Sequence, residues 1–180
     1  MTDAEQFEAF VRRYQDMVYA TAVRLLANPV EAEDVAQTVF LRAFQRFDAI
    51  GSSPAAAGWL RTVTRNACLN HLSRYRARWR FFSELATPQD SEGTSDAAEL
   101  ASAASPALEM EHADLRAQLE RALRALPDHQ RVPLVLFHFE NTSYHDIANA
   151  LGVSVSKVKS DIHRGRAALR RHLLNDHASR

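Results

Sequence analysis

Apolar residues in this 180-residue chain recur at three- and four-residue steps, and this spacing limits the fold more than any other feature. Over residues 7–25 it places the apolar side chains on one face of a helix. Asn28 offers a cap, Pro29 a first helical residue and Glu31 a capping-box partner for a second helix over residues 29–47. No useful run alternates between apolar and polar residues as a half-buried strand does. The sequence therefore predicts an all-α fold.

A third helix is predicted after the break at residues 51–54, where Ser53 offers a cap and Pro54 a first turn. This helix runs towards Arg80 and turns apolar residues such as Leu60 inward. Its outer face carries amides and guanidinium groups and no acidic residue, and the set is Arg61, Arg65, Asn66, Asn70 and Arg74. Such a face is suited to a polyanion.

Charge divides the chain although its net charge is zero. The net charges are −3 for residues 1–50, +6 for 51–82, −8 for 83–114 and +5 for 115–180. Residues 83–107 also lack a sustained apolar spacing and are rich in Ser, Ala, Thr, Asp and Glu. Two basic blocks separated by an acidic one indicate two polyanion-facing surfaces. The sequence thus predicts two small helical domains, 1–82 and 114–180, joined by a flexible acidic linker, 83–113.

Residues 143–173 have the spacing of a helix-turn-helix. Ser143 caps its first helix, and Gly152 is expected in the turn, where a side chain would obstruct the close approach of the two helices. Ser154 caps the second helix, whose outward residues would meet bases and phosphates in the major groove, and these are Lys157, Lys159, Ser160, His163 and Arg164. In the preceding helix Pro133 lacks an N–H, so it must lie in the first turn or kink the helix.

Several classes of function have no sign in the sequence. It contains no glycine-rich phosphate loop, nucleophile elbow or paired-carboxylate pattern, and its eight His residues fall in no compact ligand spacing. Cys68, the single cysteine, is interpreted as a small helix residue, with a redox role as the alternative. No apolar run approaches the ~18 residues of a membrane span, and the N-terminus lacks the order of a signal peptide. We expect a cytoplasmic protein that is not an enzyme and has no cofactor, metal site or small-molecule substrate.

Three blocks of sequence carry a resemblance to a known family. They are AEDVAQTVFLRAF at residues 32–44, WLRTVTRNACLNHL at residues 59–72, and residues 125–173, which include the helix-turn-helix. Together they resemble the extracytoplasmic-function sigma factors of the sigma-70 family. The resemblance implies a subunit that gives promoter specificity to bacterial RNA polymerase. Its implied partners are core RNA polymerase, promoter DNA and a cognate anti-sigma factor.

For the predicted first domain, the resemblance implies a surface that docks on the clamp helices of core polymerase. The candidate contacts are Glu33, Asp34, Gln37 and Leu41. Glu33 and Asp34 also have a simpler interpretation, because acidic residues near a helix N-terminus stabilise the helix dipole. Both interpretations can hold together.

The resemblance also implies that the third helix and the loop before it, residues 49–58, capture an extruded base of the minus-10 promoter element. Asn66 and Asn70 match the positions at the pocket, since an amide can donate to and accept from a Watson–Crick edge. The guanidinium groups of Arg61, Arg65 and Arg74 would hold the adjoining phosphates. A local hydrogen bond or a cap is the alternative role for Asn66.

In the predicted second domain, the residues that match contacts to the minus-35 element are Lys159, Ser160, His163 and Arg164. The sequence departs from the family pattern at three positions: Lys157 replaces a small hydroxyl residue, Asp161 a basic one and Gly165 an alanine. Asp161 would repel a phosphate unless it turns away or accepts from a cytosine amine. Gly165 should weaken its helix by roughly 1 kcal/mol.

Two other functions fit the motifs less well. One is a helix-turn-helix regulator with a ligand or dimerisation domain, which would bind an operator without being a polymerase subunit. The other is an interaction protein that only sequesters polymerase. The first would protect an operator by itself, whereas a free sigma factor should bind promoter DNA poorly.

Overall fold

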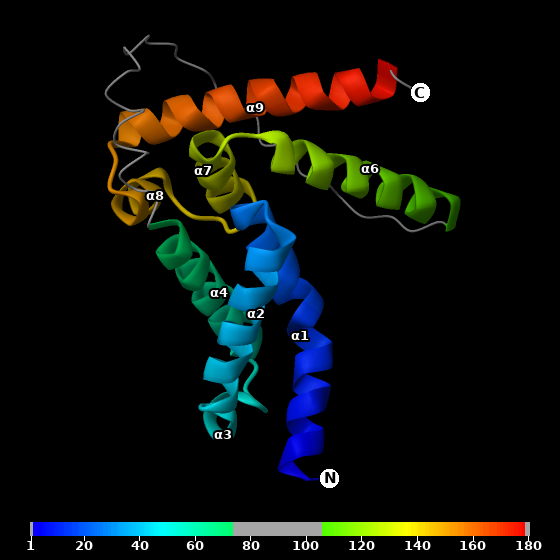
Figure 1. Ribbon diagram of the computed structural model, residues 1–180, viewed down its shortest axis with the longest axis vertical. Helices are drawn as coiled ribbons and strands as arrows, with labels where there is room; N and C mark the ends of the chain where they lie inside the picture. The colour runs from blue at the N-terminus through cyan, green and yellow to red at the C-terminus, as the bar shows by residue number, and fades with distance from the viewer. Residues whose placement is uncertain (1, 74–105, 179–180) are drawn as a thin grey trace. The chain divides into compact units, whose positions relative to one another are not determined.

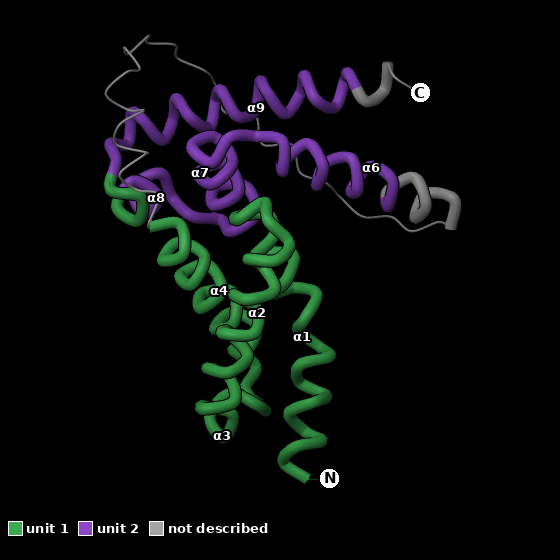
Figure 2. Tube along the Cα trace, in the orientation of Figure 1, with its two compact units in different colours: residues 1–77, 149–152 green, residues 78–148, 153–180 purple. Residues whose placement is uncertain are grey.

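The computed structural model describes residues 2–73 and 106–178, with side chains placed for 2–73 and 113–175. Within these ranges every regular element is a helix and none is a strand, which confirms the predicted all-α fold (Figure 1). The chain divides into two compact units, residues 1–77 with 149–152 and residues 78–148 with 153–180 (Figure 2). None of the described helices is long and apolar enough to span a lipid bilayer.

Three long helices and one short helix make up the first unit. They are α1 (Asp3–Leu26), α2 (Pro29–Phe44), α3 (Phe47–Ile50) and α4 (Ala56–Leu72). The long helices pack against one another in all three pairs. Val18, Val39 and Leu60, one from each, are fully buried. The apolar face predicted over residues 7–25 therefore contributes to the core of this unit.

Hydrogen bonds at the start of α2 confirm its predicted cap. The Asn28 side chain accepts from the backbone N–H groups of Val30 at 3.0 Å and Glu31 at 3.4 Å. The Glu31 carboxylate does not complete a capping box. Its Oε2 lies 3.2 Å from Nε2 of His71 near the end of α4, so it links two helices of the unit.

The segment between α2 and α4 differs from the single predicted helix over residues 29–47. α2 ends at Phe44, and the chain turns before the short helix α3. The Ser53 hydroxyl accepts from the N–H of Ala55 at 3.2 Å, which places this side-chain bond in the turn that precedes α4. Of the loop predicted over residues 49–58, only residues 51–55 lie outside the helices.

The described residues of the second unit form α6 (Pro106–Ala125), α7 (Asp128–His138), α9 (Val155–Ala178) and the first part of α8 (Tyr144–Leu151), of which residues 149–151 belong to the first unit. Both α6 and α7 pack against α9, and Leu123, Val135 and Ile162 lie in the core. α6 begins inside the segment 83–113 that was predicted as linker. Pro133 lies in the interior of α7, so of the two alternatives given for it the first-turn position is excluded, and the kink is the one that remains.

Candidate DNA and protein interfaces

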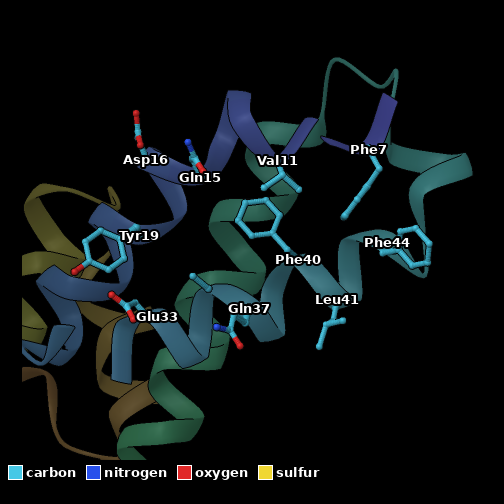
Figure 3. A pocket seen from close by; sticks show the side chains of 11 residues that line it. Phe7, Val11, Gln15, Asp16, Tyr19, Glu33, Gln37, Phe40, Leu41 and Phe44 are labelled. Atoms are coloured by element: carbon cyan, nitrogen blue, oxygen red, sulfur yellow. The ribbon is translucent and has the colours of Figure 1, made fainter. Parts of the chain in front are cut away.

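An apolar groove of about 820 Å³ runs between α1 and α2 (Figure 3). Successive turns of the two helices line it, because residues four apart share a helix face. Its lining consists of Phe7, Val11, Gln15, Asp16 and Tyr19 from α1 and Glu33, Ala36, Gln37, Phe40, Leu41 and Phe44 from α2. Leu41 is 65% exposed and Phe44 is 59% exposed. Large apolar side chains this exposed on a groove indicate a binding surface.

Three of the four residues predicted to contact polymerase line this groove, namely Glu33, Gln37 and Leu41. Asp34 is exposed on α2 but does not line the groove, and its backbone carbonyl accepts from the Thr38 hydroxyl at 3.0 Å. The aromatic lining was missed in the sequence because the apolar faces of the two helices were interpreted only as core. The signal was present in the four-residue spacings of Phe7 with Val11 and of Phe40 with Phe44, since each pair shares one face of its helix.

The outer face of α4 holds the residues predicted for the minus-10 element. Arg61, Asn66 and Asn70 are exposed and Arg65 is half-buried, whereas Arg74 lies outside the described residues. The Arg61 Nε lies 3.4 Å from the Met17 sulfur on α1, which holds its stem against the unit. No described residue forms a hydrogen bond with the Asn66 amide. The structure thus gives no support to the local alternative for that side chain.

In the second unit, side-chain caps begin both helices of the helix-turn-helix, as predicted. The Ser143 hydroxyl donates to the Asp146 carboxylate at 2.8 Å and accepts from the Asp146 N–H at 3.1 Å. The Ser154 hydroxyl accepts from the N–H of Lys157 at 3.1 Å. These bonds satisfy N–H groups that the first turn of a helix leaves unpaired.

The two glycines of this motif differ in backbone and in surroundings. Gly152 has φ +68°, and an added Cβ would meet nothing within 4 Å, so its left-handed backbone and not helix crowding favours glycine. A Cβ on Gly165 would instead lie 3.0 Å from Cδ1 of Leu134 and 3.1 Å from the carbonyl oxygen of Gln130. Gly165 thus lies where α7 approaches α9 closely, a feature that the predicted weakening of the helix did not include.

Lys157 and Asp161 form an ion pair one turn apart on α9. The Lys157 Nζ donates to both carboxylate oxygens of Asp161, at 2.6 and 2.8 Å. The side chains are 16% and 7% exposed. Asp161 thus turns away from the outer face, as one of its two alternatives required. The two departures from the family pattern compensate each other, and Lys157 is engaged inside the protein.

The remaining predicted minus-35 residues lie on the outer side of α9. Lys159, His163 and Arg164 are exposed and Ser160 is half-buried. The Lys159 Nζ lies 5.7 Å from the centroid of the Tyr144 ring, in cation–π range. Tyr144 in turn stacks on Phe137 at 4.6 Å with the rings within 2° of parallel. The aromatic pair therefore supports one of the cations predicted to meet DNA.

His129, near the start of α7, interacts electrostatically with charged residues of α9. Burial lowers the pKa of His129 below its ordinary 6.5. The Asp161 charge opposes this shift, while the Lys157 and Arg164 charges add to it. No group of three or more His, Cys, Asp or Glu residues within the described ranges could hold a metal ion.

Comparisons with known proteins give the following matches. The family model described as "Sigma-70 region 2" matches residues 10–79, and the family model described as "Sigma-70, region 4" matches residues 116–169. The RNA polymerase sigma-E factor of Streptomyces coelicolor is 35% identical over 177 residues, which cover 97% of this chain and 89% of that protein. The ECF RNA polymerase sigma factor SigW of Bacillus subtilis is 29% identical, with coverages of 95% and 90%. The solved structure of the sigma factor RpoE in complex with the anti-sigma factor NepR from Bartonella quintana is 24% identical, with a TM-score of 0.48 and coverages of 93% and 96%.

Proposed function

Because the chain belongs to the extracytoplasmic-function sigma factors of the sigma-70 family, we propose that it is a subunit that directs RNA polymerase to specific promoters. The observation that carries this proposal is the presence of sigma-70 regions 2 and 4 in order along one chain, over residues 10–79 and 116–169. A regulator that binds an operator alone would need only the second of these regions. The protein acts where RNA polymerase acts, in the cytoplasm, and it binds DNA without catalysing a reaction itself.

The predicted domain of residues 1–82 docks on the clamp helices of core polymerase through the groove between α1 and α2. An exposed apolar side chain such as Leu41 gains free energy when a partner helix removes it from water. Glu33 and Gln37 supply polar contacts along the same groove. Asp34 lies beside the groove and contributes charge at its rim. This division into an apolar centre and a polar rim is typical of protein interfaces.

The same domain captures the minus-10 element as a separated strand. Asn66 presents an exposed amide that no described residue engages, so it can bond to the edge of an extruded base. Asn70 follows one turn later, and Arg61 and Arg65 hold the phosphates on either side. Arg74 extends this role beyond the described residues. The turn at residues 51–55 forms a wall of the base pocket.

The predicted domain of residues 114–180 reads the minus-35 element as a duplex, with the outer face of α9 in the major groove. The residues that meet the DNA are Lys159, Ser160, His163 and Arg164. Lys157 serves differently, because its charge is already paired with the buried Asp161. Lys157 therefore neutralises Asp161 below the DNA face and does not act as a direct base contact.

A cognate anti-sigma factor holds the protein inactive until a signal releases it. The family resemblance carries this part of the proposal, and the exposed groove between α1 and α2 is the surface whose masking would block polymerase docking most directly. The linker predicted over residues 83–113 would thread near the active-site channel of polymerase, where its acidic charge mimics nucleic acid.

The direct test is transcription in a purified system. Core RNA polymerase, this protein and a library of genomic promoter fragments are combined, and the transcripts are sequenced. We expect a small set of specific start sites that core polymerase alone does not use. The absence of any specific transcript across the library would contradict the proposed function. Transcripts unchanged by both Asn66→Ala and Arg164→Ala would favour an interaction protein that only sequesters polymerase.

A further inference from the structure

The ring of Phe47 in α3 lies directly over Gly51, the first residue of the turn before α4. A Cβ at residue 51 would lie 2.8 Å from Cε2 and 2.9 Å from Cζ of Phe47, and 2.9 Å from its carbonyl oxygen. The backbone of Gly51 is right-handed, with φ −56°, so any residue could adopt it. The close approach of Phe47 is therefore the feature that requires glycine here.

Two other aromatic rings pack against the Phe47 ring and restrict its movement. Its centroid lies 5.2 Å from that of Phe7 at 88° and 5.5 Å from that of Phe10 at 80°. Phe7 also packs edge-on against Phe44 at 5.0 Å. Rings packed edge to face on two sides hold one orientation. A methyl group on residue 51 would therefore displace the turn and not the ring.

Hydrogen bonds would transmit such a displacement along the turn. The N–H of Gly51 donates to the carbonyl of Phe47 at 2.8 Å, and the N–H of Ser53 donates to the carbonyl of Ile50 at 3.1 Å. The Ser53 hydroxyl then accepts from Ala55, and the Ser53 carbonyl accepts from the N–H of Ala56 at 3.1 Å. The contact between Phe47 and Gly51 therefore lies at the start of a hydrogen-bonded turn.

We propose that Phe47 and Gly51 are positioning residues that fix the turn at residues 51–55 in the place needed to capture the extruded minus-10 base. This inference rests on the proposed function, in which that turn forms a wall of the base pocket. Neither residue lines the groove between α1 and α2. A change at Gly51 should therefore impair base capture while polymerase still docks.

The test uses Gly51→Ala in the full chain, assembled with core polymerase, on a promoter that the wild-type holoenzyme opens. Opening is followed by the fluorescence of 2-aminopurine in the minus-10 region. We expect the rate of opening to fall about tenfold, as overpacking at a close contact predicts. The same promoter is then made with an abasic nucleotide at each minus-10 position in turn. At the captured position the variant and wild type should open equally, because the base that the pocket holds is missing.

Gly58→Ala is the matched control, because Gly58 lies within α4, outside the turn at residues 51–55, and a Cβ there would meet nothing within 4 Å. It should open the promoter as wild type does, and both variants should bind core polymerase with wild-type affinity. If Gly51→Ala lowers the Tm of the full chain strongly, Phe47→Leu is measured by the same criteria, since it frees the turn without adding volume. Wild-type opening by the deciding variant, or an equal loss on every abasic template, would overturn the inference. A wild-type holoenzyme that opens no promoter would contradict the proposed function instead.

Discussion

The outer face of α4 and the outer face of α9 hold their polar side chains in different ways. On α4 the Asn66 amide is exposed and bonds to none of the described residues. On α9 the exposed Lys159 lies over the Tyr144 ring, which holds its charge in place. A flexible single strand can adjust to an open amide, whereas a rigid duplex is bound better by groups that are already in position. The difference suits one face to a separated strand and the other to a duplex.

Loss of the ion pair on α9 should have the largest effect. Lys157→Ala leaves the Asp161 carboxylate, whose side chain is 7% exposed, without its partner, so we expect the second unit to lose about 3 kcal/mol of stability. Denaturant unfolding of the full chain measures the loss. The apolar pair Lys157→Met with Asp161→Leu is the control and should recover most of the stability. A single variant as stable as wild type would show that α9 is not held in this way.

The groove of the first unit should depend instead on exposed apolar surface. Leu41→Asp should weaken binding to core polymerase by about 2 kcal/mol, because it places a charge in the centre of the docking surface. Stability should change by less than about 0.5 kcal/mol, since Leu41 faces solvent in the free protein. Val30→Asp is the matched control: Val30 is 66% exposed on the same helix but does not line the groove. Equal losses from the two variants in a core-binding titration would argue against the groove.

Asn66→Ala tests whether the amide on α4 serves DNA and not the fold. It should reduce promoter opening by about 1.5 kcal/mol, the cost of a lost hydrogen bond to the captured base, and leave the Tm unchanged. Thr62→Ala is the control, because Thr62 is exposed on the same helix and its hydroxyl donates to the Gly58 carbonyl at 3.0 Å. A fall in Tm without a change in opening would restore the local role for Asn66.

Removing the ring beneath Lys159 should have a smaller effect. Tyr144→Leu should weaken use of the minus-35 element by about 0.5–1 kcal/mol, the usual strength of a cation–π contact. Transcription from promoters with intact and scrambled minus-35 elements isolates this contribution. Tyr144→Phe keeps the ring and should behave as wild type. If Phe and Leu at residue 144 give the same result, the ring does not position the lysine.

The pH dependence of stability should be the mildest effect. The pKa of His129 is lowered in the folded chain, so below pH 6.5 the unfolded chain binds more protons at this residue than the folded chain does. The free energy of unfolding therefore decreases as the pH is lowered. His129→Gln should reduce this slope between the lowered pKa and 6.5. Part of the slope should remain, because burial and the Arg166 charge also lower the pKa of His138. An unchanged slope in pH-dependent unfolding would contradict the assignment.

Local patterns predicted what local interactions determine. The core faces of the helices, the Asn28 cap and the helix-turn-helix caps follow from residues a few positions apart. The direction of Asp161 and the crowding at Gly51 depend on neighbours that only the fold brings close, so spacing alone could not give them. Arg131 makes the same point: it is 2% exposed, and its Nη1 donates to the carbonyl of Leu126 at 2.7 Å, although an arginine in a basic block suggests solvent or DNA.

DNA protection with and without core polymerase tests the two-surface account most directly. The measurement uses a promoter recovered from the transcription library, at equal concentrations of this protein in both reactions. The account predicts that the minus-10 and minus-35 elements are both protected when core polymerase is present, and that neither is protected by the protein alone. Specific protection of the promoter by the protein alone, unchanged when core polymerase is added, would contradict the account and indicate a regulator that binds an operator.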